Sequence, residues 1–153
     1  MIPARDPEEA RHFSSQDKAW IQNWLQWTVS NREYLRQTRT ILDQPALGHV
    51  DGTSAILGDR GYLFLFNPNY KELPAKVVLD LSIGLNRGEG FLVRELYPQK
   101  GRLLPKSGAG WWSFGNTVNL QLDGTSATVL ELAPAAKEGQ PVLFDATALD
   151  SAH

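Results

Sequence analysis

The chain contains no cysteine, and this absence excludes several classes of site at once. Without a thiol there is no disulfide, no thiolate nucleophile and no cysteine-ligated zinc or iron–sulfur centre. The three histidines lie far apart and without the paired spacing of metal ligands: His12, His49 and His153. The sequence therefore predicts no metal site and no cofactor.

An excess of charge of one sign is missing as well. Fifteen Lys and Arg stand against seventeen Asp and Glu, which gives a net charge of −2. Nucleic acids and anionic membranes attract strongly basic proteins, so we expect neither as a partner. The first residues, 1–9, are charged and contain proline instead of the apolar run of a secretory signal. We therefore expect no signal peptide, and no compartment is indicated.

What the chain does have is enough apolar material for one domain. It has 153 residues, of which 42% are hydrophobic and 10% aromatic. A chain of about this size buries roughly 68–70% of its unfolded surface. It is too short for a complete barrel enzyme or a two-domain enzyme.

A long amphipathic helix is predicted near the N-terminus. Ser14 and Asp17 have the spacing of a capping box, in which side chains satisfy free amides at a helix start. One helical face then recurs at four-then-three spacing: Trp20, Trp24, Trp27, Asn31, Tyr34, Thr38 and Ile41. The first proline after this run is Pro45, so we expect a helix over 16–43, preceded by a flexible arm over 1–15.

After Pro45 the period of the apolar residues falls to two, which is typical of β-strands. The runs with this pattern are 61–67, 76–83, 91–97, 111–114, 118–122, 127–132 and 142–144. Turn-forming residues separate them and no helix intervenes, which favours antiparallel pairing. We expect a mainly β chain: an antiparallel β-sandwich of the Greek-key type over 50–145, preceded by the one long α-helix and followed by a loose tail over 146–153.

The pentapeptide Asp-Gly-Thr-Ser-Ala occurs twice, at 51–55 and 123–127. Asp-Gly favours a tight hairpin turn, so we expect a turn leading into a strand at both places. The flanking sequences do not match, which favours convergent turn chemistry over duplication of a sheet.

Catalytic constellations are sparse. No Gly-x-Ser-x-Gly elbow exposes a serine, and the glycine-rich run 84–90 leads into a predicted strand, so we interpret it as a hairpin loop and not a phosphate cradle. Asp51, Asp59, Glu89 and Glu95 could include a carboxylate pair for glycoside hydrolysis, but sequence spacing does not place them across a cleft. The sequence favours a chain that is not an enzyme. If the chain is an enzyme, we expect a glycoside hydrolase.

Two groups of aromatic residues are candidates for binding. Trp111 and Trp112, with Asn116 nearby, could offer an indole platform to a sugar ring, although neighbouring strand residues point to opposite faces. The second group is the helical stripe, which predicts an interface: Trp20, Trp24, Trp27 and Tyr34. Such a stripe must lie across the outside of a sheet, pair with a second copy or pack on another domain.

A resemblance to a known family follows from the order of these features. Its residues are Trp24, Trp27, Asn31 and Leu35, then Ile41-Leu42, Pro45, Gly48, 50–52, 61–68 and 126–132. This pattern, over roughly Asp17 to Pro134, resembles the end of an alpha-galactosidase-like glycoside hydrolase, where the last helix of a TIM barrel runs into a C-terminal β-sandwich. The resemblance implies that the stripe packs on a barrel. No segment matches that family's catalytic carboxylates, so no catalytic residue is assigned.

Three hypotheses follow. The first is a non-catalytic accessory β-sandwich domain, similar to that of a glycoside hydrolase, with the chain as a fragment of a larger protein. The second is a carbohydrate-binding module that uses Trp111 or Trp112. The third is a homo-oligomeric structural protein whose helices pair through the tryptophan stripe.

Overall fold

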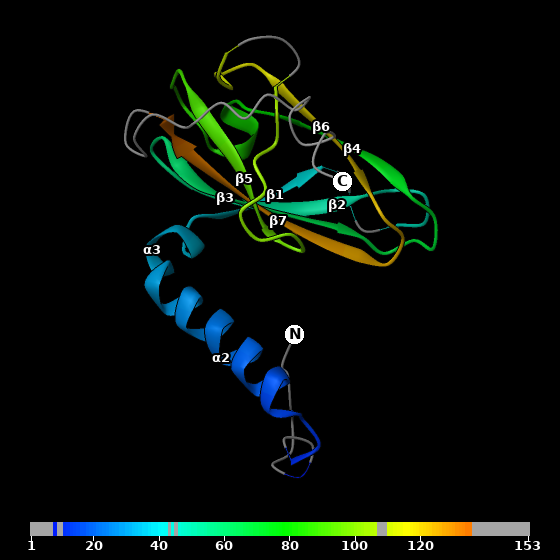
Figure 1. The fold of residues 1–153 in the computed structure, drawn as a ribbon. Coiled ribbons are helices and arrows are strands. Elements are labelled where there is room, and N and C mark those ends of the chain that lie inside the picture. The colour runs from blue at the N-terminus through cyan, green and yellow to red at the C-terminus, as the bar shows by residue number, and fades with distance from the viewer. Residues whose placement is uncertain (1–7, 9–10, 43, 45, 107–109, 136–153) are drawn as a thin grey trace, which may run out of the picture.

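The computed structural model describes residues 8, 11–42, 44, 46–106 and 110–135, and all structural statements concern these residues (Figure 1). Two helices come first, α2 (Ser15–Ser30) and the single-turn α3 (Arg32–Leu35). The strands are β1 (Thr38–Leu42), β2 (Asp51–Leu57), β3 (Arg60–Asn67), β4 (Leu73–Val78), β5 (Phe91–Tyr97), β6 (Thr117–Leu122) and β7 (Ser126–Pro134). A short 3-10 helix, η1 (Leu81–Ile83), follows β4.

The strands form two antiparallel sheets. The larger has the order β1-β2-β3-β7-β5, and the smaller consists of β4 and β6. The chain passes from one sheet to the other after β3, again between β4 and β5, and on both sides of β6. The predicted class, a mainly β antiparallel sandwich with an N-terminal helix, is confirmed.

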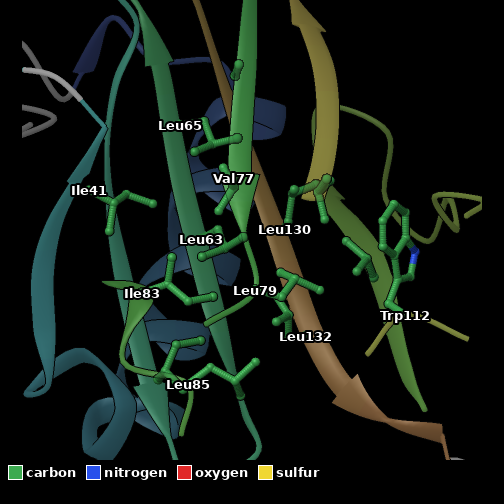
Figure 2. Close-up of a cluster of buried hydrophobic side chains, with 14 of the residues drawn as sticks. Ile41, Leu63, Leu65, Val77, Leu79, Ile83, Leu85, Trp112, Leu130 and Leu132 are labelled. Atoms are coloured by element: carbon green, nitrogen blue, oxygen red, sulfur yellow. The ribbon is translucent and has the colours of Figure 1, made fainter. Parts of the chain in front are cut away.

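The core lies between the two sheets, where alternate residues of each strand point inward (Figure 2). Leu63 and Leu65 of β3 and Leu130 and Leu132 of β7 are fully buried. Further members come from β1 and β5 of the large sheet, from the small sheet and from the segments between strands: Ile41, Val77, Leu79, Ile83, Leu85, Phe91, Val93, Trp112 and Val118.

The start of the predicted helix is confirmed, but its end at residue 43 is wrong. Ser14 caps α2 with a capping box, in which its hydroxyl accepts from the Asp17 amide at 3.1 Å. The helix ends at Ser30, and after α3 the residues Thr38–Leu42 form strand β1 against β2. This strand contains two β-branched threonines and an isoleucine, and burial of Ile41 in the core outweighs the helical spacing.

The predicted strands differ from the structure in several places. Those at 61–67, 91–97, 118–122 and 127–132 are confirmed as β3, β5, β6 and β7. The run 76–83 is a strand only to Val78, and of 111–114 only Trp112 forms a single bridge, with Phe91. The loop 84–90 lies between η1 and β5, on the connection from β4 of the small sheet to β5 of the large sheet, and is therefore not a hairpin. The run 142–144 and the tail 146–153 lie outside the described residues.

The two copies of Asp-Gly-Thr-Ser-Ala adopt different structures. The second forms the predicted turn, which leads into β7. The turn predicted at the first copy is wrong, because Asp51 begins β2 and Gly52 lies inside the sheet between Ile41 and Leu65. A Cβ at Gly52 would lie 2.7 Å from the Phe64 carbonyl oxygen, so close strand approach accounts for this glycine.

Candidate functional site

The tryptophan side of α2 lies against the outer face of the large sheet. Trp27 makes edge contacts with Tyr62 and Phe64 of β3, with ring centroids 4.8 and 6.3 Å apart. One turn earlier, Trp24 contacts Tyr97 of β5 at 6.3 Å. We call the seven connected rings the aromatic contact: Trp20, Trp24, Trp27, Tyr34, Tyr62, Phe64 and Tyr97.

All four predicted interface residues belong to the aromatic contact. Of the three partners expected for this stripe, the structure shows the outside of a sheet, because Trp24 and Trp27 contact the domain's own strands. Packing on a barrel, which the resemblance implies, stays a prediction. Trp24, Trp27 and Tyr34 are half-buried there, whereas Trp20 is 52% exposed. Contact with another molecule stays a prediction for these residues.

The sequence held a signal for this arrangement in β3. Leu63 and Leu65 point into the core, while Tyr62, Phe64 and Phe66 occupy the opposite face. A strand that is apolar on both faces needs cover on both. The stripe of α2 supplies that cover for Tyr62 and Phe64.

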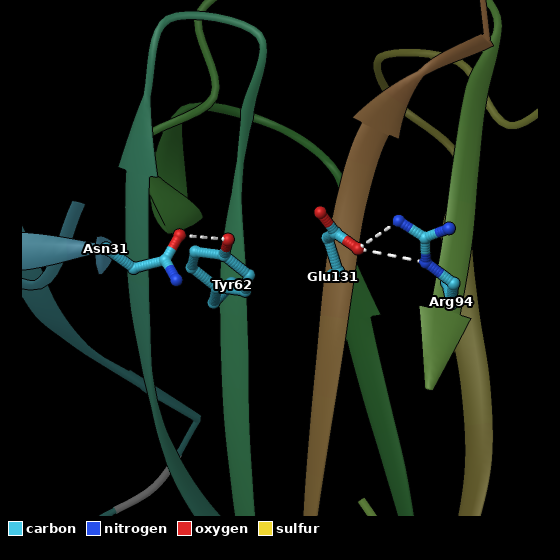
Figure 3. A network of polar contacts seen from close by, with 4 residues as sticks. All are labelled: Asn31, Tyr62, Arg94 and Glu131. Atoms are coloured by element: carbon cyan, nitrogen blue, oxygen red, sulfur yellow. Dashed lines mark hydrogen bonds and ion pairs between the residues drawn. The ribbon is translucent and has the colours of Figure 1, made fainter. Parts of the chain in front are cut away.

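A polar row accompanies the aromatic contact on the same face (Figure 3). The Tyr62 hydroxyl donates to Asn31 Oδ1 at the end of α2. Glu131 lies opposite Tyr62 in the sheet register and accepts two hydrogen bonds from Arg94 of β5, at 2.9 and 2.6 Å. Burial raises the pKa of Tyr62 to about 12, and the neighbouring Glu131 carboxylate adds to the rise.

The raised pKa of Tyr62 predicts a distinct alkaline titration. Because the folded pKa of about 12 exceeds the usual 10.0, the stabilising effect is present below pH 10 and is lost as the pH rises toward 12. Ultraviolet titration of the four tyrosines should therefore show one late component. Tyr62→Phe should remove it, whereas Tyr70→Phe, at a 97% exposed position, should leave it in place. Persistence of the late component in Tyr62→Phe would contradict the assignment.

A second side of α2 carries apolar residues that are half-buried, as Ile21 is, or exposed among the described residues. Ile21, Leu25 and Val29 follow one another at a spacing of four, so they form one ridge along the helix. Leu25 is 58% exposed and Val29 is 74% exposed. We call these three residues the helix ridge.

A cleft of about 520 Å³ runs beside β6. Its lining includes Trp112 and Asn116, two of the three predicted ligand-binding residues. Trp112 is 8% exposed and donates its indole N–H to the Leu104 carbonyl at 3.0 Å, and Asn116 Oδ1 accepts from the Ser113 amide. Trp111 lies outside the cleft lining and is half-buried beside Gly90. Sugar binding by these residues stays a prediction.

The buried carboxylates of the described chain are held by arginines. Glu95 is 1% exposed, and its side chain accepts from Arg102 and from the Gln99 amide, each at 2.7 Å. Glu131 is 7% exposed and is paired with Arg94. The other candidates come from separate elements, Asp51 from β2, Asp59 from the β2–β3 turn and Glu89 from the loop before β5.

Among the described residues, no group of three or more His, Asp or Glu side chains could hold a metal ion. Of the helices in that part of the chain, none combines the length and apolar character needed to cross a membrane.

Comparisons with known proteins give partial structural matches. No family model matches the chain, and no curated protein sequence matches it significantly. A protein of Bacillus halodurans described as a candidate α-N-acetylgalactosaminidase matches 62% of this chain, with a TM-score of 0.45 and 15% identity. An α-amylase of Geobacillus thermoleovorans in complex with acarbose matches 65% of it, with a TM-score of 0.43 and 16% identity. The chain spans 20% and 19% of their respective lengths, and both are glycoside hydrolases, the class that the sequence resembles.

Proposed function

We propose that the chain is a non-catalytic accessory β-sandwich domain of a glycoside hydrolase, and that the helix ridge is its contact surface for a larger domain. The observation that carries the proposal is the division of α2 into two apolar sides. One side is used by the aromatic contact, and the other, with Leu25 and Val29, is exposed in the described structure. The sequence resemblance supplies the class of partner, a barrel domain.

The state of the carboxylates supports the non-catalytic part of the proposal. Hydrolysis of a glycosidic bond needs one carboxyl that donates a proton and a second that acts as base or nucleophile across the same cleft. Glu95 and Glu131 are buried and paired with arginines, which suits a structural role. Among the described residues, those that line the β6 cleft include no carboxylate.

Turnover of aryl glycosides tests this proposal. The full chain, at high concentration and over a panel of nitrophenyl sugars, should release no more nitrophenol than the single variants Asp51→Asn, Asp59→Asn and Glu89→Gln. These three carboxylates are outside the two buried ion pairs, so their replacement leaves the core intact. Turnover by the native chain that disappears in one variant would overturn the proposal and identify a catalytic residue.

The carbohydrate-binding alternative rests on one observation, the presence of Trp112 and Asn116 in the lining of the same cleft. A stacking platform needs an open ring face, and Trp112 is largely buried. The accessory role is therefore the better supported of the two. Self-association through the helix stays a prediction.

A further inference from the structure

The two most exposed large apolar side chains among the described residues are Leu47 and Tyr70, which are 93% and 97% exposed. Leu47 lies between β1 and β2, and Tyr70 lies between β3 and β4. A single exposed apolar residue is common on a protein surface and needs no explanation. These two residues differ from that case, because one buried side chain joins their loops.

Asn69 makes this connection. Its side chain accepts a hydrogen bond from the Gly48 amide at 2.7 Å and donates one to the His49 carbonyl at 2.9 Å. Gly48 directly follows Leu47, and Asn69 directly precedes Tyr70. The backbone next to both exposed side chains is therefore held together at one end of the sandwich.

The backbone around Tyr70 is also held from within its own loop and from a neighbouring turn. Asn67, which is 1% exposed, donates to the Lys71 carbonyl at 2.7 Å. Gly124 lies so close that a Cβ at that position would be 2.4 Å from the Tyr70 carbonyl oxygen. The Tyr70 ring is thus open to solvent on a backbone that is already ordered, so a ligand that packs on it loses little affinity to the ordering of the loop.

A second cleft, of about 460 Å³, adjoins these loops. Its lining includes residues 48–50, directly after Leu47, and residues 73–76 of β4. Most of this lining is apolar, and His49 and Lys76 add polar side chains. Sites for small molecules have this size and this combination of apolar surface with a few polar groups. We call this site the end cleft.

The surroundings of Tyr70 favour a sugar over a protein as the ligand. Lys71 and Glu72 follow the tyrosine and are exposed, whereas lysine and glutamate are depleted from the core of protein interfaces. A sugar ring has an apolar C–H face, which packs on an aromatic ring, and hydroxyl groups, which form hydrogen bonds with charged side chains. Tyr70 therefore offers the open ring face that the largely buried Trp112 lacks.

We propose that the loops 46–50 and 68–72 form an oligosaccharide-binding site, in which Tyr70 stacks on one sugar ring while Leu47 and the end cleft contact the neighbouring rings. The end cleft shares no lining residue with the β6 cleft. The ligand class rests on the accessory role proposed above, because an accessory domain that holds a glycan raises the effective concentration of substrate for a catalytic domain.

Isothermal titration of the full chain with maltohexaose, cellohexaose and β-1,4-galactohexaose tests the proposal. At least one of these sugars should bind, and Tyr70→Ala should weaken that binding by about tenfold or more. Tyr70→Phe keeps the ring and should weaken it by less than about threefold. The matched control is Leu57→Ala, which removes a 44% exposed apolar side chain at the opposite end of β2 and should leave the affinity unchanged.

The fold of the alanine variant is checked separately. Because Tyr70 is 97% exposed, Tyr70→Ala should unfold in urea at the same midpoint as the native chain. A loss of sugar binding in this variant then reports the loss of the ring and not the loss of the fold.

Three results would overturn the site. The first is a native chain that binds none of the three sugars. The second is equal affinity of the native chain and Tyr70→Ala, and a loss of binding in Asn116→Ala would then place the sugar in the β6 cleft. The third is self-association of the native chain that Tyr70→Ala abolishes in sedimentation, which would make this surface a protein contact.

A failure of this proposal is distinguishable from a failure of the accessory role. An absence of sugar binding, together with an absence of nitrophenyl sugar turnover, would remove the site and leave the domain non-catalytic. Turnover that disappears in one of the carboxylate variants would overturn the accessory role, whatever the effect of Tyr70→Ala on affinity.

Discussion

Replacement of Asn67 by aspartate is expected to cost about 3–5 kcal/mol of unfolding free energy, because it places an uncompensated charge in a buried site. The Asn67 amide nitrogen donates to three carbonyl oxygens, of Lys71 at 2.7 Å, Leu122 at 2.9 Å and Asp123 at 3.0 Å. An introduced carboxylate loses these donors and faces the three oxygens with like charge. The measurement is urea unfolding followed by tryptophan fluorescence.

The matched control for this prediction is Asn116→Asp. The amide oxygen of Asn116 accepts from the Ser113 amide at 2.9 Å, and a carboxylate oxygen can accept the same bond. The free energy of unfolding of Asn116→Asp should therefore fall by less than about 1 kcal/mol. Equal losses in the two variants would contradict the structural role given to Asn67.

Trp27→Ala is expected to cost about 2 kcal/mol, less than the roughly 3–5 kcal/mol of a fully buried aromatic residue, because Trp27 is half-buried. The substitution removes the contacts that join α2 to Tyr62 and Phe64. Urea unfolding measures the loss. Leu25→Ala removes an apolar residue from the same helix at a 58% exposed position, and should cost less than about 0.5 kcal/mol. A larger loss of unfolding free energy for Leu25→Ala than for Trp27→Ala would show that the Leu25 side of the helix, and not the Trp27 side, packs on the sheet.

The sequence predicted the features that depend on local pattern. The capping box at Ser14 and Asp17 placed the helix start within one residue, and the period of two located four strands. These signals rest on interactions between residues a few positions apart, so one sequence contains them in full.

The features that were missed depend on distant partners. The residues of β1 continue the helical spacing of α2, and only pairing with β2 and the burial of Ile41 make them a strand. Likewise, one copy of Asp-Gly-Thr-Ser-Ala is a strand because Gly52 lies between two neighbouring strands, and the other is a turn. Identical residues took different structures because tertiary contacts outweigh local preference.

The candidate site was predicted only in part. The stripe was found by its spacing, and the outside of a sheet was one of the three partners expected for it. The sequence did not decide between them, because the second apolar face of β3 was not counted, and the resemblance favoured a barrel. Trp112 and Asn116 line the same cleft, whereas Trp111 lies outside its lining. The role of Asn67 had no sequence signal beyond that of a turn residue, because its acceptors include Leu122 and Asp123, more than fifty positions away.

The most direct test of the account asks whether α2 uses its tryptophan side on its own sheet, since the proposed role of the helix ridge depends on this. Nuclear Overhauser contacts between side-chain protons measure it in solution. The account predicts cross-peaks between the rings of Trp27 and Tyr62, whose centroids are 4.8 Å apart, and none between Val29 and the sheet. A Tyr62 ring that shows contacts only to sheet residues, with Trp27 in contact with none of them, would contradict the account.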